Sequence, residues 1–201
     1  MLRSFRLLAS ALLAAAALAQ SAGPAWREVI RPNHLDHVNE AIARVKEVNA
    51  KMGSDAADRA EGPKIEALIE AKSLPFTDVE LLGAWRCRSL QGGSLGIFSY
   101  PYFAARIRPE KRGLLFEKTG GSQLRRGTLY ADGVNQRRIF LGQQYVRGEQ
   151  PAGEDYGASL KNVRDGSGGD SFGVLVKKGP GRFVLILDAD GEQYEIYELV
   201  R

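Results

Sequence analysis

The feature that most constrains the fold is a series of short strand-like segments that fills the sequence after residue 81. Glycine-rich and aspartate-rich turns separate several of them, at residues 131–133, 178–181 and 188–191. Short strands joined by tight turns are typical of a β-sandwich or an up-and-down barrel. The segments are eight in number: Leu82–Leu90, Tyr102–Arg108, Leu114–Lys118, Leu124–Tyr130, Arg137–Tyr145, Phe172–Lys177, Arg182–Leu187 and Gln193–Val200.

We favour the barrel over the sandwich. Eight strands that follow one another as a meander can close into a barrel whose interior holds side chains or one small ligand. The long connection, residues 146–171, is rich in Gly, Asp and Glu and is interpreted as a loop. The sequence therefore predicts an eight-stranded antiparallel, lipocalin-like barrel over residues 77–201.

The preceding segment, residues 20–76, has a helical pattern and almost no aromatic residues. Apolar residues recur at helical spacing from Leu35 to Met52, which indicates an amphipathic helix. A second, shorter helix is expected from Pro63 to Lys72, with the proline in its first turn. Neither apolar stripe is wide enough for a stable isolated helix, so we expect both helices to dock on the barrel as an accessory layer. The predicted class is α+β, mainly β.

The N-terminus has the three parts of a secretory signal peptide. Arg3 and Arg6 supply the positive region, and residues 7–18 are Leu or Ala except for one Ser. This apolar run is shorter than a membrane-spanning helix, and a buried N-terminal helix is the weaker alternative. Ala17-Leu18-Ala19 gives a cleavage pattern, so residues 1–19 are predicted to be removed and the mature chain to be periplasmic or secreted. No transmembrane segment is expected after cleavage.

Composition narrows the functional classes. Cys87 is the single cysteine, which excludes an intrachain disulfide and a cysteine-based zinc site. The formal net charge is +4, but residues 20–81 carry −3 and residues 82–201 carry +5. A basic barrel is suited to an anionic small molecule or an anionic component of the cell envelope. The excess is too small and too scattered to indicate a nucleic-acid-binding protein.

Several short phrases, taken together in order and spacing, resemble domain-of-unknown-function family 4893. That resemblance covers most of the mature chain and implies an exported protein of Gram-negative bacteria, without an assigned activity. The phrases are Trp26-Arg27, Trp85-Arg86-Cys87-Arg88, Tyr100-Pro101-x-Phe103, Arg106-Ile107, Phe116-x-Lys118-x-x-Gly121-Ser122-Gln123, Phe140-Leu141-Gly142, Gly179-Pro180-x-Arg182 and Glu198-Leu199.

The resemblance also implies a second cysteine at the position of Ala105. Cys87 and Ala105 are expected on the same face of neighbouring strands, where a cross-strand disulfide would fit. Because half of such a bridge is absent, Cys87 is interpreted as a small buried apolar residue.

Arginines form the one pattern that points to a binding surface. If Trp85 and Cys87 face the interior, alternation places Arg86 and Arg88 outside, and the same parity places Arg106 and Arg108 outside on the neighbouring strand. Like charges on adjacent strands destabilise a sheet unless something offsets them. The candidate anion-binding residues are Arg86, Arg88, Arg106, Arg108, Lys118, Ser122 and Gln123.

Acidic neighbours offer another explanation for these arginines. Glu110, Glu117 or the acidic N-terminal helices could neutralise them, in which case no anionic ligand is needed. Both interpretations are compatible with the sequence, and a binding or interaction module is the favoured function.

Catalytic and metal sites are poorly supported. His34 and His37 could share a metal ion, but no third ligand is placed near them, and a polar helix start is the simpler interpretation. No catalytic residue, metal site or cofactor is predicted. The rival hypotheses are a carboxylate-based enzyme around Glu117 and a proteinaceous inhibitor of an exported hydrolase.

Overall fold

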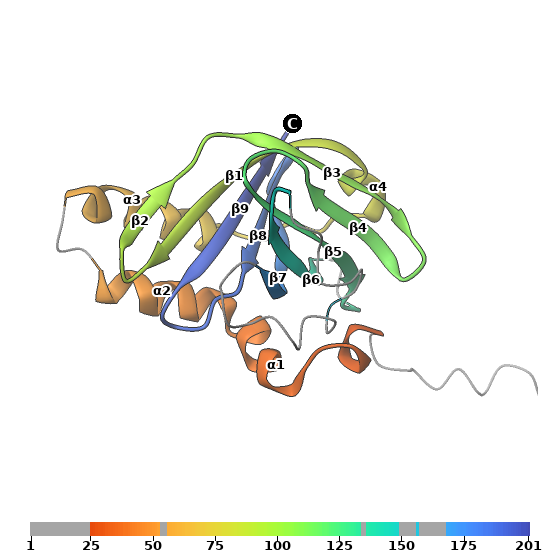
Figure 1. Cartoon of the computed structure of the whole chain (residues 1–201), viewed down its shortest axis with the longest axis horizontal. Coiled ribbons are helices and arrows are strands. Elements are labelled where there is room, and N and C mark those ends of the chain that lie inside the picture. The colour runs from red at the N-terminus through yellow and green to blue at the C-terminus, as the bar shows by residue number, and fades with distance from the viewer. Residues whose placement is uncertain (1–24, 53–55, 134–135, 149–155, 157–167) are drawn as a thin grey trace, which may run out of the picture.

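Within the described part of the chain, nine antiparallel strands form one sheet, which closes into a barrel because β1 pairs with β9 as well as with β3 (Figure 1). The structure is a computed structural model and describes residues 25–52, 56–133, 136–148, 156 and 168–201. The strands are β1 (Gly83–Gly93), β2 (Gly96–Ser99), β3 (Phe103–Glu110), β4 (Gly113–Lys118), β5 (Gln123–Ala131), β6 (Arg137–Val146), β7 (Gly168–Gly179), β8 (Arg182–Leu187) and β9 (Tyr194–Val200).

The predicted eight-stranded antiparallel barrel is confirmed. Each of the eight expected segments corresponds to a strand, and consecutive strands pair around the closed wall. The addition is β2, which forms a hairpin with the far end of β1 and pairs Leu90 with Ser99 and Gly93 with Gly96. The hairpin turns at Ser94 and Leu95, and Gly96 follows with a φ of +108°, which suits glycine. The predicted signal peptide lies outside the described residues.

The helices differ in detail from the two that were expected. The first is divided at Glu40, whose φ of −105° and ψ of 10° interrupt the helix. Pro63 lies inside a helix rather than in its first turn. That expectation was wrong because tertiary contact extends the helix: Asp58 accepts a hydrogen bond from the Ile97 backbone N–H at 2.8 Å, which fixes the earlier turns against β2. The helices are η1 (Ala25–Glu28), α1 (Pro32–Asn39), α2 (Ala41–Lys51), α3 (Ala56–Glu70) and α4 (Asp78–Leu81).

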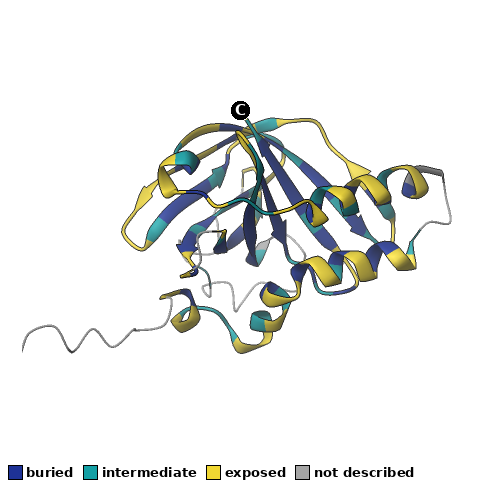
Figure 2. Ribbon diagram, turned by 180° about the vertical axis from the view of Figure 1, so that it is seen from behind, coloured by how far each residue is buried: buried dark blue, intermediate teal, exposed yellow. Residues whose placement is uncertain are grey.

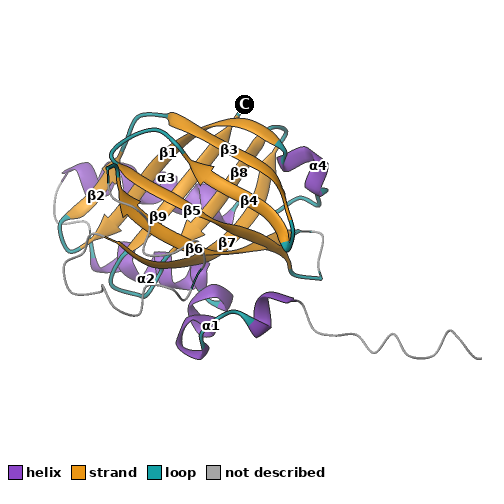
Figure 3. Cartoon of the chain, turned by 45° about the vertical axis from the view of Figure 1, so that its right-hand side comes forward, coloured by secondary structure: helices purple, strands orange, loops and turns teal. Residues whose placement is uncertain are grey.

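One apolar cluster joins the helices to the outside of the barrel. On the strands that the helices cover, both the inward and the outward side chains are apolar. The helices pack on the outward side chains, and their own outer faces stay exposed (Figures 2 and 3). Val45 and Ile69 from the helices meet Val184, Ile186 and Ile196 from the strands, all nearly inaccessible to solvent. The helices therefore share a core with the barrel. No helix within the described ranges is both long enough and apolar enough to span a membrane.

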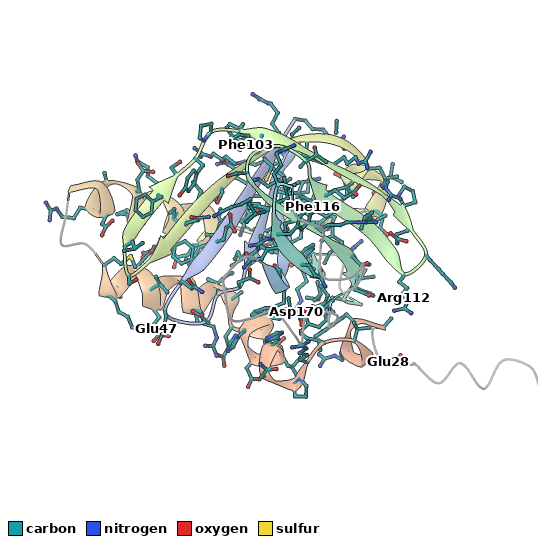
Figure 4. The ribbon with its side chains drawn as sticks, in the orientation of Figure 1. Glu28, Glu47, Phe103, Arg112, Phe116 and Asp170 are labelled. Carbon is teal, nitrogen blue, oxygen red and sulfur yellow. The ribbon has the colours of Figure 1, made fainter. Side chains whose placement is uncertain are left out.

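A second apolar cluster fills one half of the barrel interior. Phe116, Phe140 and Tyr197 pack there, and Figure 4 shows Phe116 within the barrel. Beside α4, Trp85 closes this end by donating its indole N–H to the Leu81 carbonyl at 2.7 Å. This half of the interior is packed with side chains.

Cys87 belongs to the interior cluster, as expected of a small apolar residue. Its side chain is buried, and burial raises the pKa of its thiol well above the ordinary value. Ala105 is also buried inside, but it pairs with Trp85, whereas Cys87 pairs with Phe103. The two positions are diagonal neighbours on one face.

Candidate functional site

The other half of the barrel interior is polar and open. A cavity of about 550 Å³ lies at this end, next to α1. The same inward positions that carry apolar side chains at the closed end carry polar ones here: along β5, Leu129 gives way to Arg125 and Gln123, and along β9, Tyr197 gives way to Glu195. The inward side chains therefore form a polar cavity, which we call the chamber, next to the apolar cluster that fills the closed end of the barrel.

Arg125 is the central group of the chamber. Its Nη2 lies 2.7 Å from Glu195 Oε2 and 2.8 Å from Gln144 Oε1, and its Nη1 lies 2.9 Å from Asp188 Oδ2. Burial disfavours the charge on Arg125, but the two carboxylates, Asp188 foremost, outweigh burial and raise its pKa above the ordinary value. One guanidinium thus holds two carboxylates in place.

Asp188 reaches this position through an unusual backbone conformation. Its φ of +49° is the one positive φ of a non-glycine residue in the described ranges. The carboxylate accepts hydrogen bonds from Ser171 Oγ at 3.0 Å and from the Phe172 backbone N–H at 2.9 Å. Burial raises the pKa of Asp188, and Arg125 partly opposes that effect. Aspartate tolerates this left-handed conformation in turns, and these hydrogen bonds fix the position of its carboxylate.

Glu195 extends the network toward β1. Its Oε1 accepts hydrogen bonds from Ser89 Oγ at 2.5 Å and from Gln91 Nε2 at 3.1 Å. Gln91 in turn donates to Gln123 Oε1 at 3.3 Å, at the edge of the opening. The wall of the chamber is therefore held in place by hydrogen bonds between its own side chains.

Helix α1 forms part of the rim. His34 stacks on Phe172 with ring centroids 4.1 Å apart, and its Nδ1 is hydrogen-bonded to the Tyr156 hydroxyl. Burial, assisted by Arg31, lowers the pKa of His34 from its ordinary value. His37 lines the same cavity. Within the ranges that the structure covers, no three His, Cys, Asp or Glu side chains gather as a metal site.

The cavity has a negative balance of charge. Among the residues that the structure describes, four carboxylates line it, from Asp170, Asp188, Asp190 and Glu195, against one guanidinium, that of Arg125. Asp170 lies at the end next to α1 (Figure 4) and is paired with Arg31 at 2.7 Å, which leaves an excess of two negative charges. An anion entering this chamber would meet like charge.

The seven candidate anion-binding residues are not brought together. Four of them, Arg86, Arg88, Arg106 and Arg108, lie on the outer wall, on the side that strand parity indicates. Gln123 lies at the rim of the cavity, and Ser122 is exposed in the β4–β5 turn.

Lys118 occupies a third place, inside the barrel. Only 4% of it is exposed, and its Nζ donates to the Gln123 carbonyl at 2.5 Å. The Phe103 and Tyr197 rings lie 5.1 and 5.7 Å from that nitrogen. Lys118 does not line the cavity because it packs beneath the β4–β5 turn.

Glu117, the suggested catalytic carboxylate, also lies away from the cavity. It is on the outer wall, with Arg106 at 2.8 Å and Arg108 at 3.4 Å. The cavity instead uses Arg125, Asp188 and Glu195, which the sequence reasoning missed. The available signal was parity: Arg125 and Gln123 share the inward phase of Leu129, and Glu195 shares that of Tyr197.

Comparison with known proteins places most of the chain in one family. The model of a domain of unknown function, DUF4893, matches residues 26–199. No curated protein matches the chain. A solved structure of a redesigned β-barrel is 12% identical, covers 65% of this chain and 98% of its own, and has a TM-score of 0.41. A redesigned β-barrel bound to the compound DFHBI is 12% identical, covers 62% and 97%, and has a TM-score of 0.33.

Proposed function

This chain belongs to the DUF4893 family, and we propose that it is an exported binding protein that takes a small polar molecule into the open end of its barrel. The observation that carries this proposal is the chamber itself: about 550 Å³ of space lined by side chains that already hold one another in place. Ligand sites in small barrels occur at the mouth, and pre-ordered polar groups lower the entropic cost of binding.

The lining favours a neutral or cationic ligand with several hydroxyl or amino groups. Amides from Gln91, Gln123 and Gln193 can each donate and accept hydrogen bonds. Aromatic side chains of Phe98 and Tyr145 at the same opening offer surfaces on which a sugar-like ring can lie. The excess of carboxylates opposes an anion inside the barrel.

Binding is favoured over carboxylate-based catalysis for a geometric reason. Both interior carboxylates are engaged, since Asp188 accepts bonds from Ser171 and Phe172 and both acids face Arg125. A carboxylate whose oxygens already accept hydrogen bonds is poorly placed to take a proton from a bound molecule.

A charge-matched series of sugars tests the ligand class. Glucosamine, N-acetylglucosamine and glucuronate share one ring and differ in charge, so calorimetric titration separates charge from shape. We expect heat of binding from the amino sugar or the neutral sugar and none from glucuronate. Preference for glucuronate would show that the interior carboxylates do not control selection.

Export is the second element of the proposal. It is supported by the n-region arginines, the Leu/Ala run and the small-residue cleavage pattern. N-terminal sequencing of protein from a Gram-negative host should begin near Gln20 in the periplasmic fraction. Full-length protein retained in the cytoplasm would contradict it.

A further inference from the structure

The barrel wall beyond the helices carries six arginines that face outward. Among the described residues they come from β8, β1, β3 and β5, with β9 between β8 and β1 and β4 between β3 and β5 in the closed sheet. We call this surface the arginine wall; its members are Arg86, Arg88, Arg106, Arg108, Arg126 and Arg182.

Two carboxylates are shared among five of these arginines. Glu198, only 2% exposed, accepts bonds from Arg88 Nε at 2.5 Å and Arg182 Nε at 2.6 Å. The other carboxylate, Glu117, faces three arginines, with Arg126 at 3.6 Å in addition to the two already described.

The sixth arginine, Arg86, has an aromatic partner. Its guanidinium lies 5.4 Å from the centre of the Tyr102 ring. No carboxylate pairs with Arg86 among the residues that the structure describes. The arginine wall and its two acids therefore carry a net charge of about +4. The β3–β4 hairpin adds Glu110, Lys111 and Arg112, which do not offset it.

Exposed aromatic side chains border the same surface. Tyr100 and Tyr102, in the connection from β2 to β3, are 42% and 39% exposed. Tyr102 joins the two features, since its ring lies 5.4 Å from Arg86 and from Arg88 and its hydroxyl donates to Glu198 at 2.9 Å.

We propose that the arginine wall and its aromatic border dock the protein on a membrane surface rich in anionic phospholipid. Guanidinium groups form paired hydrogen bonds with phosphate, and surface arginines are attracted to anionic leaflets. Tyrosine rings are enriched at the boundary between headgroups and acyl chains. The aromatic border favours a membrane over a soluble polyanion, which would use the charges and leave the rings in water. This surface is separate from the cavity, so the proposal does not depend on the proposed ligand.

Vesicle co-sedimentation of the mature chain tests this docking. The probes are phosphatidylcholine vesicles with and without phosphatidylglycerol, at low and high salt, with dextran sulfate as a soluble polyanion. The wild type should bind the anionic vesicles, and binding should fall as salt rises. The double change Arg86→Gln with Arg106→Gln should weaken the partition about thirtyfold, the weight of two surface arginines.

Two further variants identify the surface. Lys64→Gln with Lys72→Gln removes the same charge from the helical side and should leave vesicle binding nearly unchanged. Tyr102→Ser should weaken vesicle binding more than dextran sulfate binding. Unchanged urea midpoints would show that all variants are folded, and a chain carrying Gln123→Trp at the cavity rim should bind vesicles normally.

Three outcomes would overturn the proposal: no binding to anionic vesicles by the wild type, an equal loss in the lysine control, or dextran sulfate binding with no vesicle binding. The last would identify a soluble polyanion as the partner. If vesicle binding fails but sugar binding is observed, only the membrane-docking proposal is contradicted. If sugar binding fails but vesicle binding is observed, only the cavity proposal is contradicted.

Discussion

Arg125 and Glu195 meet inside the barrel with Nη2 and Oε2 2.7 Å apart, and 2% and 12% of their side chains are exposed. Asp188 faces the same guanidinium from the other side at 2.9 Å. The guanidinium compensates one of the two carboxylates, so Arg125, Asp188 and Glu195 together carry one net negative charge at the cavity. The stability of the barrel therefore depends on this network of buried charges.

Removing the central cation should be costly. Arg125→Met leaves Asp188 and Glu195 buried without their partner, so we expect the free energy of unfolding to fall by roughly 3–5 kcal/mol in urea titrations. Adding Glu195→Gln to this variant should restore part of the loss, since one buried charge disappears. If Arg125→Met alone is as stable as the wild type, then Arg125, Asp188 and Glu195 are in contact with solvent in the folded protein.

The titration of Lys118 should make the free energy of unfolding depend on pH in the alkaline range. Burial lowers the pKa of this lysine from the ordinary 10.5. Between the lowered value and 10.5 the unfolded chain binds more protons than the folded chain, so stability increases with pH across that interval. Below this interval Lys118 is charged in both the folded and the unfolded chain, and the full destabilisation from burying its charge is present.

Lys118→Met should make this rise smaller, since burial also lowers the pKa of Lys178, and should be no less stable than the wild type at neutral pH. Urea midpoints measured from neutral to alkaline pH check both points. Lys64→Met, at a side chain that is 68% exposed, is the control and should keep the wild-type slope. If Lys118→Met also keeps that slope, the lysine is not desolvated in the folded protein.

The barrel could be predicted from the sequence because its signal is local. Alternation and turn residues mark each strand without knowledge of its partners, and the same parity places Arg86 and Arg106 outside. The helix ends were harder to predict from the sequence. The helix α3 begins before Pro63, where Asp58 accepts a hydrogen bond from the Ile97 backbone N–H, and local helix propensity carries no information about such a tertiary contact.

The cavity could not be predicted for a related reason. Arg125, Asp188 and Glu195 come from three strands or their ends, and only the register of the closed sheet brings them together. Asp188 lies in what the sequence indicates as a hairpin turn, where an aspartate needs no further explanation. Lys118 is grouped with the arginines by its charge, although on β4 it shares the inward phase of Phe116.

A close approach of two strands should make Gly142 irreplaceable. It pairs with Gly127, and a Cβ added at Gly142 would lie 2.2 Å from the Arg126 carbonyl oxygen. Gly142→Ala should therefore destabilise the protein by about 2 kcal/mol or more in urea titrations. Gly169→Ala in β7, where the added Cβ meets nothing within 4 Å, is the matched control and should change little. Equal midpoints for the two variants would contradict the tight β5–β6 contact.

Closing the cavity at its rim is the most direct test of the central claim, that the open end of the barrel binds a small polar molecule. Gln123→Trp places a bulky ring at the opening, whereas Gln136→Trp makes the same change at an exposed position before β6 that does not line the cavity. Calorimetric titration with the tightest-binding sugar of the charge-matched series should give wild-type affinity for Gln136→Trp and at least a tenfold loss for Gln123→Trp. Equal affinities in both variants, or no binding of any sugar by the wild type, would contradict the account.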